Sequence, residues 1–298
     1  MFARNKRKHL EACLQSAVAQ SWPDLEIVFS DQGSTDGTRE LMQEYADRYK
    51  GPATIRVLDC PDRTPAGMSA LNEHLNWIMA QLDTDVVLVS ASDDVAHPDR
   101  TAKVMQAYEQ HDPAMVLTAM QFDDVDNPAG RSLGHTAYER PEGFLTGAEI
   151  IENAIGGSAS QSWRLDFFNK IGGCKGIQPQ DVFYCFLAAQ DKGVYWLPEP
   201  LYCYVMHADE HNTGLGGVQL AAEYAGDKAK SAQVVELMHY QITSSYCALV
   251  ERAQELYPNM READRTRLFH ELLSRSYSWA KARDTLTYSN VPPLPMVA

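Results

Sequence analysis

Ser30-Asp31-Gln32-Gly33-Ser34-Thr35-Asp36-Gly37-Thr38, residues 30–38, is the stretch that decides how the surrounding chain folds. The apolar run before it, which ends at Phe29, is typical of a buried strand and predicts one over residues 25–30. The residues after it have a helical period and a Ser/Thr/Asp cluster at their start, which predicts a capped helix over 36–49. A polar loop between such a strand and helix lies at the sheet edge where open α/β sheets bind ligands. Taken alone, the segment is equally compatible with a well-capped turn that binds nothing.

Strands and helices alternate on both sides of this loop up to about residue 100. Such alternation predicts an α/β fold with a doubly wound, mostly parallel sheet. The remaining expected elements of this half are helices over residues 8–20 and 68–82 and strands over residues 53–58 and 85–90.

The regular alternation of strands and helices ends in the second half of the chain. A helix over 101–111 and a strand over 115–122 are followed by a helix–loop–helix pattern over 147–192. Short strands are expected at 195–197 and 201–205. The pattern is then almost continuously helical from Gly217 to about residue 285. We therefore expect one large α/β domain, residues 1–216, and a helical C-terminal segment, residues 217–298.

Composition narrows the functional classes. The 298 residues include 26 basic and 40 acidic side chains, a formal net charge of -14. Such a charge disfavours a broad phosphate-binding surface, and a bound nucleotide would need a divalent metal to offset charge. The sequence has no apolar run of membrane-spanning length and no apolar signal core. Its six cysteines are dispersed without a C-x-x-C pair, so we expect reduced thiols and a cytoplasmic protein.

A second polar segment, Ser92-Asp93-Asp94, follows the strand expected at 85–90. Adjacent carboxylates repel one another and are favoured where a cation or polar ligand compensates them. The alternative is an N-cap for the helix that begins near Pro98. In a doubly wound sheet the loops at 30–38 and 90–97 open on the same edge, so their carboxylates can converge on one ligand.

These segments and several others occur in the order found in the glycosyltransferases of family two, which the chain resembles over about residues 1–210. The matching pieces are Asn5 with the helix after it, the segment 26–38, Gly67 with Leu71-Asn72, Ser92-Asp93-Asp94 with Pro98, Gly172-Gly173-Cys174 with Gln180-Asp181, and Tyr202 to His207. The resemblance implies the GT-A fold and an inverting enzyme that uses a nucleotide-diphosphate sugar, here a UDP-sugar, usually with Mg²⁺ or Mn²⁺. The family normally begins with a longer apolar strand, of which only the end, Met1 to Asn5, is present here.

The resemblance also implies roles for individual residues. Asp93 would bind the metal, with His207 as a possible further ligand. Gln32 stands where the family often has a carboxylate, and Ala91 where it often has the first aspartate of the metal motif, so the base selectivity and the ribose contact stay open. The residues expected to bind the nucleotide sugar are Phe2, Ala3, Arg4, Asn5, Asp31, Gln32, Gly67, Asn72, Ser92, Asp93 and Asp94.

Asp181 is the candidate general base. An inverting transfer needs one carboxylate on the acceptor side to take the proton of the attacking hydroxyl. The same residue type at the start of a helix is also a good N-cap, and a capping position would fix the side chain. Trp163 and Arg164 precede a helix in the segment that often lines the acceptor pocket, although a core tryptophan is an equally good interpretation.

The predicted function is metal-assisted transfer of a sugar to a hydroxyl acceptor, which could belong to a glycan, a lipid-linked glycan, a protein or a modified nucleic acid base. The C-terminal helices would complete the acceptor side or mediate homo-oligomerisation. A non-catalytic binding or assembly protein that keeps the fold is the alternative from another class. A nucleotidyltransferase is disfavoured because the basic segment 4–8 contains no glycine.

Overall fold

The computed structural model describes residues 1–61, 68–124, 134–135, 140–152, 160–174, 180–206, 251–263, 265–266 and 270. The chain divides into two compact units, Met1–Asp209 and Glu210–Ala298. Within the second unit a helix is described over residues 251–256. The predicted boundary at residues 216/217 and the predicted C-terminal helices stay predictions, because most of that segment lies outside the described residues.

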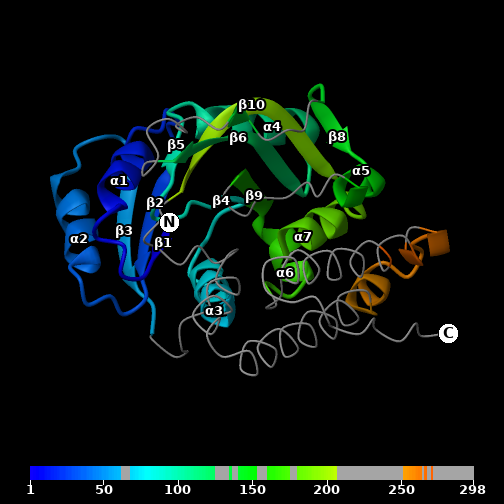
Figure 1. Cartoon of the computed structure of the whole chain (residues 1–298), viewed down its shortest axis with the longest axis horizontal. Coiled ribbons are helices and arrows are strands. Elements are labelled where there is room, and N and C mark those ends of the chain that lie inside the picture. The colour runs from blue at the N-terminus through cyan, green and yellow to red at the C-terminus, as the bar shows by residue number, and fades with distance from the viewer. Residues whose placement is uncertain are drawn as a thin grey trace, which may run out of the picture. The chain divides into compact units, whose positions relative to one another are not determined.

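The first sheet holds three parallel strands in the order β1 (Phe2–Ala3), β2 (Glu26–Asp31) and β3 (Thr54–Asp59). Helices α1 (Leu10–Val18) and α2 (Thr38–Arg48) lie beside it (Figure 1). Their apolar faces meet the central strand in one buried cluster that includes Leu10, Leu14, Phe29, Leu41 and Met42. Burying these side chains is the main force that fixes the strand–loop–helix unit of residues 26–48.

The second sheet is larger and mixed. Its strands follow the order β4 (Val86–Leu88), β9 (Gln161–Arg164), β6 (Met115–Asp124), β10 (Val194–Met206) and β5 (Val95–Ala96), while β7 (Gly134–His135) pairs with β6 and β8 (Gly143–Leu145) pairs with β10. The central β6–β10 pair is parallel, whereas β5, β8 and β9 pair in antiparallel fashion. The predicted α/β class with a parallel-rich sheet is confirmed.

The two short strands expected at 195–197 and 201–205 are one strand, β10. Its register against β6 shifts between Leu197 and Pro200 and again between Pro200 and Tyr202. Proline has no N–H to give to the ladder, so Pro198 and Pro200 interrupt the pairing locally without ending the strand.

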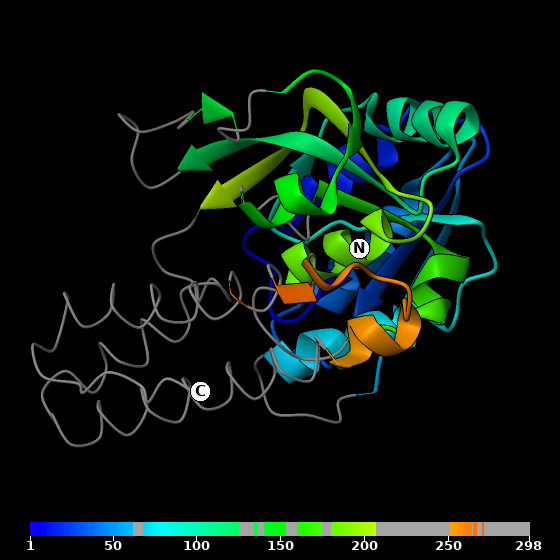
Figure 2. The ribbon, with the colours of Figure 1, turned by 90° about the vertical axis from the view of Figure 1, so that its right-hand side faces the viewer.

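Five further helices cover the second sheet: α3 (Met68–Met79), α4 (Arg100–His111), α5 (Gly147–Glu152), α6 (Leu165–Lys170) and α7 (Gln180–Ala189). Helix α4 packs on one face of β6 and β10 through Val104, Ala107 and Tyr108, while α6 and α7 lie on the opposite face (Figure 2). None of the helices in the described part of the chain has both the length and the apolar character needed to cross a lipid bilayer.

The two sheets meet at β1. This strand is only two residues long, and a single bridge between Phe2 and Ala91 connects it to the end of the segment that contains β4. Both sheets direct the carboxyl ends of their parallel strands to this junction, so the loops after β2 and β4 open beside each other as predicted.

Candidate active site

The segment after β1 is fastened to the polar loop after β2. Asn5 has a φ of 52°, a left-handed conformation that asparagine tolerates better than most residues. Its backbone N–H donates to Ser34 Oγ at 2.8 Å, and its side-chain Oδ1 accepts from the N–H of Thr35 at 2.9 Å. The N–H of Gln32 donates to the carbonyl of Ala3 at 3.0 Å. The structure therefore brings the expected residues of both segments together.

The loop itself begins in the core. Asp31 and Gln32 are 3% and 4% exposed. Asp31 Oδ2 accepts from the N–H of Ser34 at 2.9 Å, whereas its Oδ1 is buried and has no hydrogen-bond partner. Helix α2 begins at Thr38 and not at residue 36, because Gly37 has a φ of 89°. Asp36 still caps it, since its Oδ1 accepts from the N–H of Thr38 at 3.0 Å.

Helix α3 places two polar side chains against this region. Asn72 is 3% exposed, and neither its Oδ1 nor its Nδ2 has a hydrogen-bond partner. His74 is 2% exposed and lies 2.7 Å, Nε2 to Oγ, from Ser30 in β2. Burial lowers the pKa of His74 to about 4, so the ring is neutral. Gly67, which was predicted to belong to the site, lies outside the described residues.

The two acidic residues after β4, Asp93 and Asp94, lie in different environments. Asp93 Oδ2 lies 2.8 Å from Lys6 Nζ. Asp94 is 1% exposed; its Oδ1 accepts from the N–H of Val205 at 2.9 Å, and its Oδ2 has no hydrogen-bond partner. Burial, and then the charge of Asp93, raise the pKa of Asp94 to about 7. The alternative of an N-cap is wrong for both residues, because α4 begins at Arg100 and Asp99 is the residue before it.

Three of the predicted site residues have buried polar atoms without a hydrogen-bond partner. Within the described residues, every buried carboxylate or carboxamide oxygen without a hydrogen-bond partner belongs to Asp31, Asn72 or Asp94. Buried polar atoms are almost always hydrogen-bonded in folded proteins, since an unpartnered one costs about 1–3 kcal/mol. Asp31 lies in β2 beside β1, Asp94 follows the bridged Ala91, and Asn72 belongs to the helix whose His74 contacts Ser30 and Phe2. Three such residues in segments that adjoin β1 indicate a site built for a polar ligand. Ser92, also predicted there, is 3% exposed.

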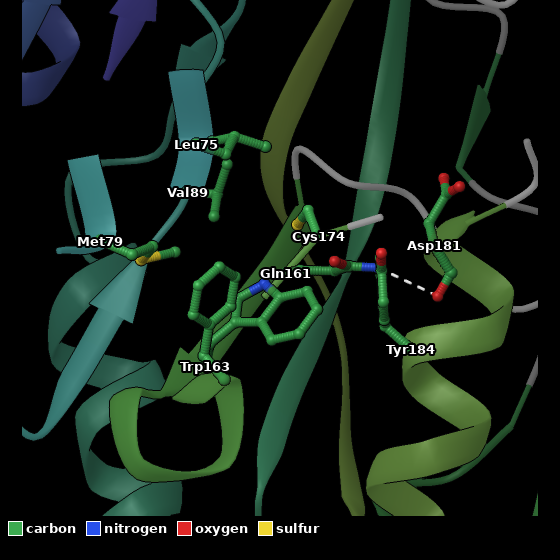
Figure 3. A pocket seen from close by; sticks show the side chains of 9 residues that line it. Leu75, Met79, Val89, Gln161, Trp163, Cys174, Asp181 and Tyr184 are labelled. Carbon is green, nitrogen blue, oxygen red and sulfur yellow. Dashed lines mark hydrogen bonds between the residues drawn. The ribbon is translucent and has the colours of Figure 1, made fainter. Parts of the chain in front are cut away.

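A pocket beside this junction contains the candidate base. Figure 3 shows it between α3, the end of β4, β9 and α7, with the lining residues Leu75, Met79, Val89, Gln161, Trp163, Phe168, Cys174, Asp181 and Tyr184. Gln161 connects its two sides, since its carbonyl accepts from the N–H of Val89 at 3.2 Å and its Nε2 donates to the carbonyl of Asp181 at 3.3 Å. Asn72 lies one helical turn before Leu75, on the face of α3 that lines the pocket.

Asp181 is half-buried in the first turn of α7, so it is not the N-cap that was considered as an alternative. A carboxylate in a first turn is favoured by the helix dipole. Its carboxylate points away from the ring of Trp163 (Figure 3). The Asp181 carboxylate therefore lies at the wall of the pocket and not among the apolar side chains around Trp163.

The turn before Asp181 is tied to α3 by a pair of hydrogen bonds. Asn76 Nδ2 donates to the carbonyl of Cys174 at 2.8 Å, and Asn76 Oδ1 accepts from the N–H of Cys174 at 2.7 Å. Gly173 has a φ of 75°, and a Cβ there would lie 2.4 Å from Asn76 Oδ1. Gly173, one of the residues that carry the family resemblance, is thus needed because any side chain here would lie too close to Asn76. Sequence reasoning missed Asn76 and Gln161, whose partners are far away in the chain.

The two residues predicted to line the acceptor site lie apart. Trp163 is 3% exposed and packs against Phe167, Phe168 and Tyr184, so its ring belongs to the core under the pocket. Arg164 pairs with Asp112, and its guanidinium lies 5.2 Å from the ring centre of Tyr108. Because successive side chains of a strand point to opposite faces, Arg164 lies against Tyr108 of α4, on the other face of the sheet from Trp163 and the pocket. The structure does not bring it together with the other candidates.

The described residues contain no group of three or more His, Cys, Asp and Glu side chains that could hold a metal ion. His207, the second predicted ligand, lies outside them. Mg²⁺ and similar hard ions, however, are often held by one or two carboxylates together with the phosphates of the substrate. Asp93 and the unpartnered Oδ2 of Asp94 fit the protein's part of such a shared site.

Comparison with known sequences agrees with this geometry. The family model described as glycosyl transferase family 2 matches residues 1–177. A curated relative, the putative glycosyltransferase EpsE of Bacillus subtilis (strain 168), is 24% identical over 200 residues, which cover 66% of this chain and 68% of that protein.

Two solved structures show similar folds. S. aureus TarS, residues 1–349, in complex with UDP, superposes with a TM-score of 0.63 at 16% identity and covers 95% of this chain and 72% of that one. The mannosyltransferase PcManGT from Pyrobaculum calidifontis, in complex with GDP-Man and Mn²⁺, gives a TM-score of 0.52 at 13% identity and covers 96% of this chain and 83% of that one. At this level of identity the comparison shows the fold, which is GT-A.

Proposed function

This chain belongs to glycosyl transferase family 2, and from that premise we propose that it is an inverting glycosyltransferase that moves a sugar from a nucleotide-diphosphate donor, a UDP-sugar, to a hydroxyl acceptor. One observation carries the proposal. The buried carboxylate and carboxamide atoms without partners belong to Asp31, Asn72 and Asp94, which lie in three segments that adjoin β1. A nucleotide sugar offers the hydroxyl, imide and phosphate groups that would satisfy them.

The UDP assignment has two supports. The TarS structure contains UDP, and Gln32 is buried beside Asp31 at the end of β2. An amide both donates and accepts, so it can pair with the N3–H and a carbonyl of uracil. The PcManGT structure contains GDP-Man, so GDP donors belong in any test of this assignment.

Asp181 is proposed as the general base. The acceptor hydroxyl attacks the anomeric carbon, the bond from that carbon to the diphosphate oxygen breaks, and the hydroxyl proton passes to the carboxylate of Asp181. The placement of Asp181 in the first turn of α7, with its carbonyl bonded to Gln161, holds this side chain on a rigid element at the pocket wall.

A divalent ion, Mn²⁺ or Mg²⁺, would supply positive charge to the leaving diphosphate, and Asp93 with His207 is predicted to hold it. The Mn²⁺ in the PcManGT structure supports this assignment. The acceptor, a glycan, lipid-linked glycan, protein or modified base, and the role of residues 217–298 stay predictions.

The test is a panel of UDP- and GDP-sugars scored by release of nucleoside diphosphate, with and without Mn²⁺, in the presence of candidate acceptors. We expect one UDP-sugar to be turned over. Asp181→Asn should lower kcat by at least about 10²-fold while donor binding is retained. If no donor binds, or if Asp181→Asn turns over normally, the proposal fails.

A non-catalytic sugar-nucleotide-binding protein is the second candidate. It is favoured by Ala91, whose methyl group stands where a metal ligand is expected. Donor binding without turnover for any acceptor in the same panel would select this second candidate.

A further inference from the structure

Lys6 spans the two loops of the candidate site. Its backbone N–H donates to Thr38 Oγ1 at 2.8 Å, which anchors the residue on the first turn of α2. Its side chain reaches across the sheet junction to Asp93, with 2.8 Å between Nζ and Oδ2. Both side chains are largely shielded, with 23% and 24% of their surfaces exposed. The ammonium group is thus held in the place where a cation bound to Asp93 would sit.

The charges around the Lys6–Asp93 pair affect how readily another cation can bind there. In a chain with a formal net charge of -14, four of the five residues 4–8 are basic. Arg7 of this segment is itself fixed, because its backbone N–H donates to Asp36 Oδ2 at 3.0 Å. A pair of opposite charges at 2.8 Å, partly withdrawn from water, resists a second cation, because that cation must displace the first or share its carboxylate.

We propose that Lys6 is a donor-responsive counter-ion: it neutralises Asp93 while the site is empty, and it transfers to the phosphate oxygens of the donor when a nucleoside diphosphate binds, which releases Asp93 for a divalent cation. This inference rests on the proposed function, since it requires a diphosphate ligand. It assigns to Lys6 a binding role that sequence reasoning did not give it. It also makes the binding of nucleotide and metal mutually dependent.

The coupling follows from charge balance. Without nucleotide, a divalent cation must compete with an ammonium group that is already bonded to Asp93. With nucleotide, the phosphates offer Lys6 a partner of higher charge, and Asp93 becomes available. By thermodynamic linkage the metal must then strengthen nucleotide binding by the same factor by which nucleotide strengthens metal binding.

The experiment compares the full-length chain with Lys6→Met, which removes the charge but keeps a similar length and leaves the backbone bond to Thr38 available. Lys8→Met is the matched control, since Lys8 is an exposed lysine two positions away. Free Mn²⁺ is measured by electron paramagnetic resonance, and UDP binding is measured by calorimetry in EDTA and in Mn²⁺. Thermal unfolding of each variant confirms that it is folded.

We expect Lys6→Met to bind Mn²⁺ about fivefold more tightly than the parent chain when nucleotide is absent, because a partly shielded ion pair no longer opposes it. In EDTA the same variant should bind UDP about tenfold more weakly, because one charge-assisted contact to phosphate is lost. The factor by which UDP strengthens Mn²⁺ binding should fall accordingly. Lys8→Met should match the parent in all three measurements.

Unchanged or weaker Mn²⁺ binding by Lys6→Met overturns the inference, as does UDP affinity in EDTA equal to that of the parent. If the parent binds no Mn²⁺ even with UDP, the competition does not exist and the inference also falls. Failure of the proposed function looks different: the parent then binds neither UDP nor GDP under any condition, while the Mn²⁺ titration without nucleotide still reports on the Lys6–Asp93 pair.

Discussion

At the scale of single residues, the buried imidazole of His74 makes stability depend on pH. Burial lowers its pKa from an ordinary value of 6.5 to about 4. Between pH 4 and 6.5 the unfolded chain therefore binds a proton that the folded chain does not. The contribution of His74 to the free energy of unfolding therefore rises with pH across this window, by up to about 3 kcal/mol. The raised pKa of Asp94, about 7, gives a contribution that falls with pH over nearly the same window.

Replacement of His74 by glutamine should remove the rising contribution, so the free energy of unfolding of the parent chain minus that of the variant should increase from pH 4 to 6.5 in urea-unfolding experiments. His97→Gln is the control, because the His97 side chain is 51% exposed in its contact with Asp99. If the difference between the parent chain and His74→Gln stays constant over this pH range, His74 does not contribute to the pH dependence.

Asn5 is a second residue with a separable role. Alanine at this position should lower the free energy of unfolding by about 2 kcal/mol, because it loses the bond to Thr35 and is strained at a φ of 52°. Glycine accepts that φ and should cost only about 1 kcal/mol through the lost bond. Denaturant unfolding of both variants separates the two contributions. Equal losses would show that the backbone conformation is not strained.

Candidate site residues could be named from the sequence where a polar side chain directly follows an apolar strand. Asp31, Gln32, Asp93 and Asp94 could be singled out because polar residues directly after apolar strands have few structural reasons to be there. Lys6 could not, since its significance comes from a contact across 87 positions in the chain, which no local pattern encodes.

At the scale of elements, the contact between α3 and the turn at Gly173 fixes the chain after α6. Gly173→Ala should cost about 2–3 kcal/mol of stability, because its φ is 75° and its Cβ would lie 2.4 Å from Asn76 Oδ1. Asn76→Ala should also be destabilising, since Cys174 loses two hydrogen bonds.

A double-mutant cycle checks the origin of these costs by urea unfolding. Removing the Asn76 carboxamide also removes the atom that the added methyl group of Gly173→Ala would strike. The double variant should therefore lose about 1 kcal/mol less than the two single losses combined. Strict additivity would mean that the two residues act independently.

Element positions were predictable where hydrophobic periodicity is strong, as for α1, β2 and β6. The residues at which helices and strands begin and end were less predictable. The start of α2 is displaced by the positive φ of Gly37, and the two prolines of β10 suggested a break where the structure has register shifts. In both cases tertiary packing decided between two locally acceptable conformations.

At the scale of the whole molecule, the proposed ligand site connects two sheets that share one β-bridge, Phe2 to Ala91. UDP at about 100 times its Kd should raise the free energy of unfolding by about 2.7 kcal/mol. Hydrogen exchange should slow both at residues 4–6 and at residues 91–96, because one ligand would contact both loops. Protection confined to one sheet would contradict a shared site.

The order of motifs along the chain predicted the fold class, because strands alternating with helices allow few architectures. It did not predict that the first sheet would join the second through only two residues of β1. That outcome depends on how Phe2 and Ala3 fit between strands that are distant in sequence.

The long pairing of β6 with β10 has a consequence for the order of folding during synthesis. β2 and β3 are close in sequence and share a hydrophobic cluster, so the first sheet closes small loops and can form early. β6 can pair with β10 only after that strand has been synthesised, since Met115 pairs with Val194. A ribosome that has released only the first half of the chain therefore presents β6 without either of its flanking strands, β9 and β10, and with both edges open, the stage at which a chaperone would have most to protect.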